Sequence, residues 1–447
     1  MKKHNKNAET EIKRLVNNTK HWKNQRLDWI STFVRGNTGF KKDELLNKGE
    51  YIALQYGKTY KVDIIDESFI YFVNSEFYKS NQIVNQGDTI LISTSETIQD
   101  LGHSCFYNRY DLGLLGGEQI LLKPNKKLII EKYLYYYSKS FCKEFKKYAS
   151  GLKVFRYNID DLKKIFIAIP SLEEQIAIVK YLDNKNQAID KKIEFLSKKI
   201  DKYKEFRKSL INKAVTTGLD KNCKIKFTEH NFQVNNDYNR FRLKDLGYLY
   251  SGLSGKSGDD FNQDENDNNK GFIPFTNIAN NTYLKKDHLG AVVVYENENQ
   301  NKVQKGDIFF LMSSEGYEDI GKSAILDDDL EETYLNSFCK GYRVTNKKAN
   351  PYFLNYLLLS DSYRKQLTIE GKGFTRINLK MEKVNDFKVY LPNSIDEQIK
   401  IVEFLDQKTQ TIDNIVININ KQIEALKELR KTLINDVVTG KIKVVDN

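Results

Sequence analysis

Residues 175–183 read Gln-Ile-Ala-Ile-Val-Lys-Tyr-Leu-Asp, and residues 398–406 read Gln-Ile-Lys-Ile-Val-Glu-Phe-Leu-Asp, 223 residues later. The match extends over 175–212 and 398–435 and ends on nearly the same residues in both copies. This period is far outside the range of solenoid repeats, which is roughly 20 to 50 residues. The chain therefore contains a duplicated unit, a globular part followed by a long helix, and we expect it to recognise two copies of its target.

Apolar residues in each long helix follow an alternating spacing of four and three, which is typical of a coiled-coil seam. Arg207 and Arg430 take the apolar position before the last. We expect the seams to pair antiparallel as a rod of about 39 Å that separates two globular units by a fixed distance. The alternative is two separate amphipathic helices, each covering its own domain. The seam positions are Ile189, Ile193, Leu196, Ile200, Tyr203 and Leu210, then Ile412, Val416, Ile419, Ile423, Leu426 and Leu433.

The start of each long helix is well marked. Pro170 and Pro392 stand at matching joints, and each is followed by a polar residue and an acidic first turn. Acidic side chains at that end offset the unpaired N–H groups and the positive end of the helix dipole. We therefore expect helices over 171–220 and 392–447, which serve as a central and a C-terminal spacer.

Two regions, from about 26 to 169 and from about 242 to 391, alternate short apolar strands with Gly and Asn turns. In each, a Gly-Asp turn, at Gly87 or Gly306, precedes a fully apolar run that predicts a buried central strand. The fold class is thus α+β, with a curled or barrel-like sheet in each region. We expect one domain over 1–170, including a polar helix within residues 1–20, and a second over 221–391.

Composition limits the function without deciding it. A net charge of +11 and a pI near 9.0 favour a polyanionic partner, although the joint excess of Lys, Asn, Ile and Tyr also fits an AT-rich genome. The four cysteines are scattered, and the five histidines lack ligand spacing, so neither a zinc site nor a disulfide framework is expected. Without a signal peptide or a membrane-length apolar run, we expect a cytoplasmic protein with no membrane partner.

Two sequence strings imitate catalytic motifs and do not complete them. Gly255-Lys256-Ser257 resembles the end of a phosphate-binding loop, but Tyr250 stands where the first glycine is needed. Asn350-Pro351 resembles part of an adenine methyltransferase loop, but the same letters fit an asparagine cap with proline at the first helical position. We therefore predict no catalytic residue and no metal site in this chain.

Basic and aromatic residues in the turn-rich segments are the better candidates for function, because lysine and arginine neutralise phosphates and arginine can read base edges. Arg156 and Arg376 stand out because they follow matching glycines, Gly151 and Gly371, at equal distances. The candidates are Arg35, Lys41, Lys42, Lys58, Tyr107, Arg109, Lys153 and Arg156 in the first region, and Lys256, Tyr317, Lys322, Lys340, Lys372 and Arg376 in the second.

The doubled set of helix motifs resembles the specificity subunit of type I restriction–modification enzymes, and the match spans essentially the whole chain. Because the globular regions diverge in that family, weak alignment between them is expected. The motifs that carry the resemblance are Leu172-Glu173-Glu174-Gln175-Ile176, Ile189-Asp190 and 214–218 in the first copy, and Ile395-Asp396-Glu397-Gln398-Ile399, Ile412-Asp413 and 437–440 in the second.

This resemblance implies that each globular region is a target recognition domain that reads one half of a split, asymmetric site in double-stranded DNA. The helices would fix the gap between half-sites and dock two methyltransferase subunits, and restriction subunits would join them. The partners would use S-adenosylmethionine, ATP and Mg²⁺, and this chain would hold no cofactor. Two alternatives stay open: a coiled-coil protein that binds nucleic acid without sequence preference, and a DNA-modifying enzyme fused to its own reader.

Overall fold

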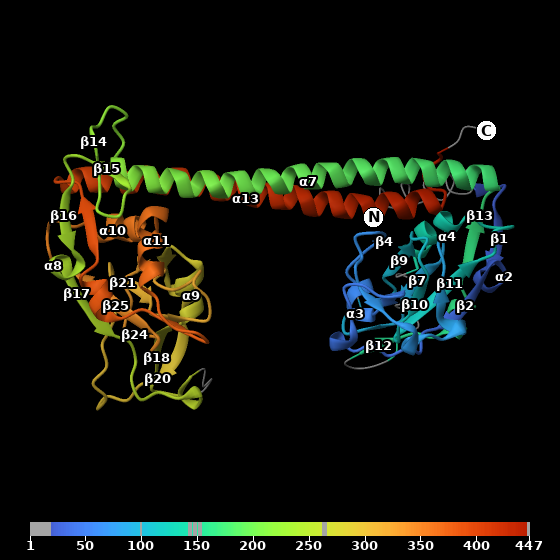
Figure 1. Cartoon of the computed structure of the whole chain (residues 1–447), viewed down its shortest axis with the longest axis horizontal. Coiled ribbons are helices and arrows are strands. Elements are labelled where there is room, and N and C mark those ends of the chain that lie inside the picture. The colour runs from blue at the N-terminus through green and yellow to red at the C-terminus, as the bar shows by residue number, and fades with distance from the viewer. Residues whose placement is uncertain are drawn as a thin grey trace, which may run out of the picture. The chain divides into compact units, whose positions relative to one another are not determined.

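The computed structural model describes residues 19–98, 101–141, 145, 150, 154–261 and 266–444. The chain divides into two compact units, the first formed by residues 1–196 with 420–447 and the second by residues 197–419. Each unit contains one globular region together with part of each long helix (Figure 1). The boundary therefore cuts across both helices. The polar helix predicted within residues 1–20 lies almost entirely outside the described residues.

The first unit is built on a five-stranded sheet in the order β2-β11-β7-β9-β4, beside a four-stranded sheet in the order β5-β3-β10-β6. The strands of the larger sheet are β2 (Ser31–Arg35), β11 (Gln119–Pro124), β7 (Thr89–Ile92), β9 (Ser104–Tyr107) and β4 (Ile64–Ile65). Those of the smaller sheet are β5 (Phe72–Val73), β3 (Tyr51–Leu54), β10 (Gly113–Leu115) and β6 (Ile83–Val84).

Two short strand pairs and several short helices complete this unit. The pairs are β1 (Lys23–Arg26) with β13 (Phe166–Ile169), and β8 (Thr94–Ser95) with β12 (Phe155–Arg156). The helices are α2 (Leu27–Ile30), α3 (Tyr56–Thr59), α4 (Glu131–Ser138) and α6 (Ile159–Leu162), with 3-10 turns η1 (Lys42–Glu44), η2 (Ser75–Phe77) and η3 (Ser80–Gln82).

The second unit repeats the main sheet in the order β17-β25-β21-β23-β19, beside a three-stranded sheet in the order β20-β18-β24. The main strands are β17 (Gly247–Ser251), β25 (Cys339–Val344), β21 (Ile308–Leu311), β23 (Ser323–Leu326) and β19 (Tyr283–Leu284). The others are β20 (Gly290–Val293), β18 (Asn269–Ile273) and β24 (Thr333–Leu335).

Three strand pairs and five short helices complete the second unit. The pairs are β14 (Ile225–Phe227) with β15 (Gln233–Asn235), β16 (Asn239–Arg242) with β27 (Lys388–Leu391), and β22 (Ser313–Ser314) with β26 (Ile377–Asn378). The helices are α8 (Leu243–Leu246), α9 (Phe275–Asn280), α10 (Pro351–Leu359), α11 (Asp361–Glu370) and α12 (Met381–Asn385), with 3-10 turns η4 (Gly258–Asp260) and η5 (Lys286–His288).

The two main sheets have the same strand order and the same directions, with antiparallel neighbours except for a parallel pair at one edge, β4·β9 or β19·β23. This shared topology confirms that the globular part was duplicated along with the helix. Neither sheet closes on itself in its strand order, so the structure contains no closed barrel of the kind that the sequence offered beside a curled sheet. Each region instead divides its strands between a five-stranded sheet and a smaller one.

The predicted central strands are β7 and β21, and all four residues of each are buried. Each lies in the middle of its sheet, with a neighbour on either side. Gly87 and Gly306 precede them with φ angles of 96° and 86°, in the left-handed region that glycine adopts without strain. The Gly-Asp turn therefore leads the chain from the surface into the core, as the sequence predicted.

The two long helices are α7 (Leu172–Thr217) and α13 (Ile395–Val438), each continuous over its whole length. The side chain of Ser171 accepts a hydrogen bond from the backbone N–H of Glu174 at 3.2 Å, as an N-cap does. Gly218 and Gly440 follow the helix ends with φ angles of 79° and 75°. Glycine with positive φ is the common way to end a helix.

Within each unit, the first half of one long helix packs against the last half of the other. In the first unit, Ile178 and Leu182 of α7 share a core with Ile434 and Val437 of α13. In the second unit, Ile401 of α13 shares a core with the end of α7. Because the start of each helix meets the end of the other, the pairing is antiparallel. All twelve predicted seam residues are buried or half-buried.

The arginines that interrupt the seam are paired across it. Arg430 donates a hydrogen bond through Nη2 to Asp190 in the first unit, and Arg207 Nε lies 3.3 Å from Asp413 Oδ1 in the second. Each aspartate stands on the partner helix, so the ion pair occurs once in each unit. Because each arginine in the seam needs a carboxylate opposite it, the two ion pairs favour this helix register over neighbouring ones.

One buried glutamine fastens each globular region to its long helix. The side chain of Gln175 accepts from Ile130 N at 2.8 Å and donates to the carbonyls of Leu128 and Pro170. Gln398 accepts from Asn350 N at 2.8 Å and donates to the carbonyls of Lys348 and Pro392 at 2.9 and 3.0 Å. Both side chains are fully buried, so no water can replace these bonds.

A tyrosine–aspartate bond provides a second attachment about two turns further along each of these helices. Tyr136 of α4 donates to Asp183 of α7 at 2.5 Å, and Tyr356 of α10 donates to Asp406 of α13 at 2.6 Å. Burial, helped by the acceptor carboxylate, raises the pKa of Tyr356 to about 12, so its hydroxyl remains a donor at neutral pH. The repeated Gln and Asp of the helix motif therefore orient the globular regions.

Candidate nucleic-acid interface

A short strand pair lies beyond the central strand in each unit, and it carries the two matched arginines. β12 pairs with β8 and places Arg156 opposite Thr94, while Arg376 directly precedes β26, which pairs with β22. The Ser and Thr residues of β8 and β22 are buried, because the chain has left the apolar core strand but has not reached the surface. The frame around each arginine is thus fixed by backbone pairing on the edge of the core.

The two arginines rest on equivalent backbone but on different side chains. Arg156 Nη2 lies 3.8 Å from Glu118 Oε1, whereas the guanidinium carbon of Arg376 lies 4.5 Å from the ring centre of Phe338. Glu118 and Phe338 hold matching positions, because the carbonyl of each accepts from the residue that follows the central strand. Both arginines are exposed. The same scaffold therefore presents an arginine in two chemical settings.

Several predicted residues of the second unit come from loops that leave this frame. Tyr317 lies on the loop after β22 and is half-exposed, and Lys372 is bridged to Asn378 beside β26. Lys340, at the start of β25, donates to Ser251 Oγ at 3.0 Å. We take these residues and Arg376 as the candidate surface of the second unit, because they are basic or aromatic and stand on or beside β22, β25 and β26. Phosphate contacts and base contacts both require such groups.

Other predicted residues lie elsewhere or are already engaged. Lys256 is held by Glu298 at 2.5 Å and its side chain is almost enclosed, while Lys322 pairs with Asp319 at 2.6 Å. Lys58 stands 4.4 Å above the ring of Tyr71. In the first unit, exposed side chains follow one another from the end of β2 into η1, and these are Arg35, Lys41 and Lys42. Lys153 lies outside the described residues.

Burial removes Tyr107 and Arg109 from the candidate DNA contacts. Tyr107 has no exposed surface, and its hydroxyl donates to the carbonyl of Asp111 at 2.8 Å. Arg109 is 8% exposed, and its guanidinium binds the Asp111 carboxylate and the carbonyls of Asp66 and Phe69. Four of the five N–H donors of this arginine are bonded within the protein, so its role is to hold a loop.

Two residues of this surface were missed from the sequence, Phe338 and Phe374. Phe374 stands on the loop between α11 and β26 and is fully exposed. The signal that could have revealed it is its position between Lys372 and Arg376, since an aromatic residue flanked by two cations in a glycine-containing loop is suited to nucleic acid. Phe338 gave no such signal, because its role depends on folding beside Arg376.

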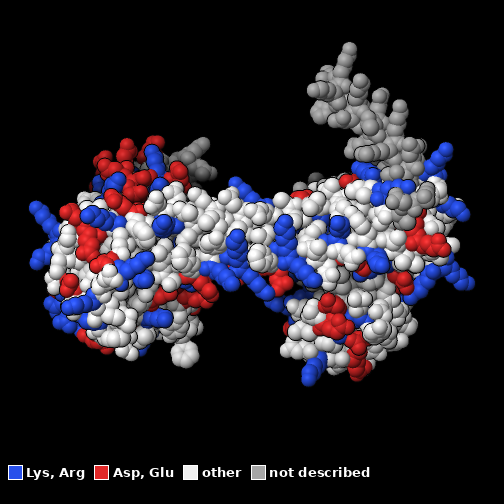
Figure 2. All heavy atoms as spheres, turned by 90° about the horizontal axis from the view of Figure 1, so that it is seen from above, with Lys and Arg blue, Asp and Glu red and all other residues white. Residues whose placement is uncertain are grey.

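Much of the positive charge lies away from these loops. Figure 2 shows lysine and arginine side chains along the central stretch of the long helices. On α7, the exposed lysines include Lys191, Lys192, Lys198, Lys199 and Lys202. The positive charge of the chain is therefore a poor guide to the recognition surface, because part of its lysine and arginine lies on a solvated helix face.

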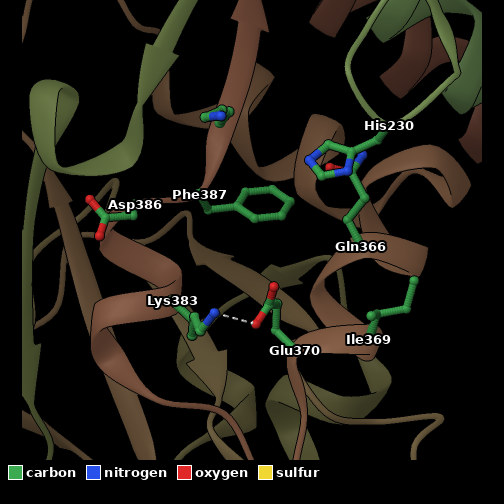
Figure 3. Close-up of a pocket in the computed structure, with 8 residues that line it drawn as sticks. His230, Gln366, Ile369, Glu370, Lys383, Asp386 and Phe387 are labelled. Carbon is green, nitrogen blue, oxygen red and sulfur yellow. Dashed lines mark ion pairs between the residues drawn. The ribbon is translucent and has the colours of Figure 1, made fainter.

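A cavity of about 260 Å³ in the second unit offers no catalytic arrangement. Its carboxylates are held by lysines. Lys383 pairs with Glu370 at 2.9 Å (Figure 3), and Lys244, outside the cavity lining, pairs with Asp386 at 2.6 Å. The hydrogen bond from Lys244 lowers the pKa of Asp386, which makes it a weaker base. The cavity is lined by His230, Gln366, Ile369, Glu370, Lys383, Asp386, Phe387 and Lys388.

The catalytic look-alikes in the sequence have structural roles. The side chain of Asn350 accepts from the backbone N–H groups of Tyr352 and Phe353 at 2.9 and 3.0 Å, so it caps α10 as predicted. Burial raises the pKa of the Cys105 and Cys339 thiols to about 12, which keeps them protonated. Among the described residues, no cluster of His, Cys, Asp and Glu could hold a metal ion. Nor is any described helix both long and apolar enough to span a bilayer.

A family model described as the type I restriction modification DNA specificity domain matches residues 19–222 and, a second time, residues 235–425. The chain belongs to this family. Each match of the specificity domain takes in one globular region and at least the larger part of the helix that follows it. The duplication inferred from the helix motifs is therefore a duplication of the family's own domain, and the chain is a DNA specificity subunit.

Relatives and solved structures agree with this assignment. The type I restriction enzyme MjaVIII specificity subunit of Methanocaldococcus jannaschii is 25% identical over 431 residues, which covers 93% of each chain. A chain from work on complex assembly and conformational transition of the type I R-M system has a TM-score of 0.68 at 13% identity and covers 94% of this chain and 98% of that one. The HsdS subunit from Thermoanaerobacter tengcongensis has a TM-score of 0.51 at 13% identity, with 94% and 97% covered. These structures share the fold of two α+β domains joined by long antiparallel helices.

Proposed function

We propose that each globular region of this specificity subunit binds one half of a bipartite, asymmetric site in double-stranded DNA. One observation carries the proposal. The same strand pair presents Arg156 beside Glu118 in the first unit and Arg376 against Phe338 in the second. A common scaffold with different side chains is what two readers of different half-sites require, because base contacts determine sequence while the scaffold positions them.

The long helices would set the gap between the half-sites. α7 and α13 are each one continuous helix whose parts belong to both units, so backbone hydrogen bonds determine their length. Rigid linkage would make the second half-site contact effectively intramolecular, which raises the affinity of the pair above that of either reader alone.

Insertion of one heptad into both helices tests this spacer role. Seven residues inserted after Leu196 and seven after Ile419 keep the seam in phase and add about 10.5 Å, or about three base pairs of DNA. We expect the preferred gap to lengthen by about three base pairs while both half-sites stay unchanged. Insertion into α7 alone is the control, since it separates Arg207 from Asp413 and should destabilise the helix pair. An unchanged gap after the double insertion would refute the spacer role.

The helices also carry apolar side chains that suit the docking of methyltransferase subunits. Phe195 and Leu429 are exposed in the first unit, and Phe206 and Ile417 are exposed in the second. An exposed apolar side chain recurs at the matching position of the two copies, as Phe206 and Leu429, and this recurrence supports a docking role. Replacing Phe206 and Leu429, which hold matching positions, with serine should release the methyltransferase subunits in co-purification and leave thermal stability unchanged.

We assign the chemistry to those partners, which would bind S-adenosylmethionine, and to restriction subunits, which would use ATP and Mg²⁺. The support is that Asn350 caps a helix and Lys256 is held by Glu298, so the two motifs that resembled cofactor loops have structural roles. The purified chain should therefore transfer no methyl group to DNA when given S-adenosylmethionine, and should do so once the methyltransferase is added. Methylation by the chain alone would favour the fused-enzyme alternative.

A further inference from the structure

The loop between α11 and β26 carries a phenylalanine that the fold leaves exposed to solvent. Phe374 has a relative exposure of 106%, the highest among the large apolar side chains that the structure describes. An aromatic ring gains free energy when it leaves water, so a fully exposed one is unfavourable unless a partner covers it. The neighbouring Ile377 is buried, which shows that the loop returns to the core directly after the exposed ring.

This loop has a defined shape. Lys372 and Asn378 exchange two backbone hydrogen bonds of 2.9 and 2.8 Å, which close its base. Gly373 has a φ of 147°, and a Cβ atom there would lie 1.9 Å from the carbonyl oxygen of Arg376. Only glycine permits this close approach, so the sequence is committed to a tight turn. Phe374 therefore stands at the tip of a closed turn that is anchored to the strand pair of the candidate interface.

The surroundings of the ring are cationic and aromatic. Lys372 and Arg376 are exposed on either side of it in sequence, and Arg376 is held against the half-exposed ring of Phe338. Cationic side chains at this spacing suit phosphate groups, which lie on both sides of every base step. A protein partner would require a larger apolar patch than one ring flanked by charges. The arrangement therefore favours nucleic acid.

We propose that Phe374 enters the base stack of the half-site bound by the second unit, as an apolar wedge that stacks on an exposed base. Apolar side chains that insert between base steps unstack them and bend the duplex, which adds discrimination because steps differ in how easily they open. Phe374 would thus determine specificity, with Lys372 and Arg376 binding the flanking phosphates. The inference rests on the proposed function, since it requires that the second unit binds DNA.

The first unit would read its half-site without this wedge. When the two units are aligned on Arg156 and Arg376, Val154 stands where the second unit has Phe374. Glu118 likewise stands where the second unit has Phe338. Valine has no aromatic face to stack on a base. The two half-sites should therefore differ in deformation as well as in sequence, with an opened base step only on the side of the second unit.

The test uses the full chain and duplexes selected by the wild type from a random pool. 2-Aminopurine is placed at each position of both half-sites in turn, and fluorescence and affinity are measured at one fixed salt concentration. The variants are Phe374→Ala, Phe374→Trp and, as a matched control, Phe227→Ala. Phe227 is also exposed in the second unit, at 64%, but stands on β14. Thermal unfolding of each variant verifies that these surface changes leave the fold intact.

We expect wild-type binding to raise 2-aminopurine fluorescence at one step of one half-site. Phe374→Ala should abolish that rise and weaken binding to the selected duplex roughly 5- to 100-fold, with less than a twofold change for random duplex. Phe374→Trp should restore both signals, and Phe227→Ala should behave like wild type. The wedge is refuted if Phe374→Ala retains the fluorescence rise or binds as tightly as Phe227→Ala. A wild type that binds selected and random duplexes equally would instead overturn the proposed function.

Discussion

Replacement of Gln398 by leucine should loosen the second recognition region from its helix. The side chain bonds the backbone N–H of Asn350 and the carbonyls of Lys348 and Pro392, at 2.8, 2.9 and 3.0 Å, and it is fully buried. Leucine of similar volume fills the space but leaves three backbone groups without this partner, one of them buried and two partly buried. A buried group without its hydrogen bond costs about 1 to 3 kcal/mol. Partial relaxation reduces the sum, and we expect a net loss of about 3 kcal/mol.

For a unit of this size, such a loss corresponds to a fall in the thermal unfolding midpoint of roughly 6 to 12 °C. Differential scanning calorimetry of the full chain measures it. Gln407→Leu is the matched control, because Gln407 lies on the same helix and is exposed. Its midpoint should stay within about 2 °C of wild type. Equal shifts for the two variants would show that the Gln398 bonds do not hold the domain, and the account of the attachment would be wrong.

Further predictions concern pH and backbone conformation. Burial raises the pKa of Asp88 from 3.8 to about 6, so its contribution to stability is most favourable below pH 3.8 and is lost as the pH rises through 6. Asp88→Asn should therefore stabilise the protein by up to about 3 kcal/mol at pH 8 and hardly at all near pH 4, measured by urea unfolding; equal gains at both pH values would contradict this assignment. Gly218→Ala places a Cβ 3.0 Å from the Tyr238 hydroxyl at a φ of 79°, and should cost about 1 to 2 kcal/mol. Gly258→Ala, where the Cβ meets nothing within 4 Å, should cost less than half of that in the same unfolding assay, and equal costs would refute the argument.

The sequence predicted those elements whose signal is local or periodic. Three signals depend on only a few neighbouring residues: the seam spacing, the acidic helix starts and the Gly-Asp turns. These signals correctly predicted the two long helices and the central strands β7 and β21. The last seam position of α7 was predicted one residue too early. Leu210 is only half-buried, while Ile211, Ala214 and Val215 enter the core, because the helix end leaves its partner and packs against the second recognition region.

The individual contact residues could not be predicted in the same way. A tyrosine or arginine in a turn-rich segment has the same sequence environment whether it faces solvent or the core. Arg109 is internal only because Asp111 and two distant carbonyls converge on it after folding. Arg156 and Arg376 were placed more securely, since the duplication supplied an independent second copy of the same position.

The central claim is that two separate readers contribute one half-site each. The most direct test exchanges residues 26–169 for the corresponding region of another family member, expresses the chimaera with its methyltransferase and maps methylated adenines across the genome. The account predicts that one half of the recognised sequence changes, while the other half and the gap stay the same. A change in both halves, or in the gap, would contradict it.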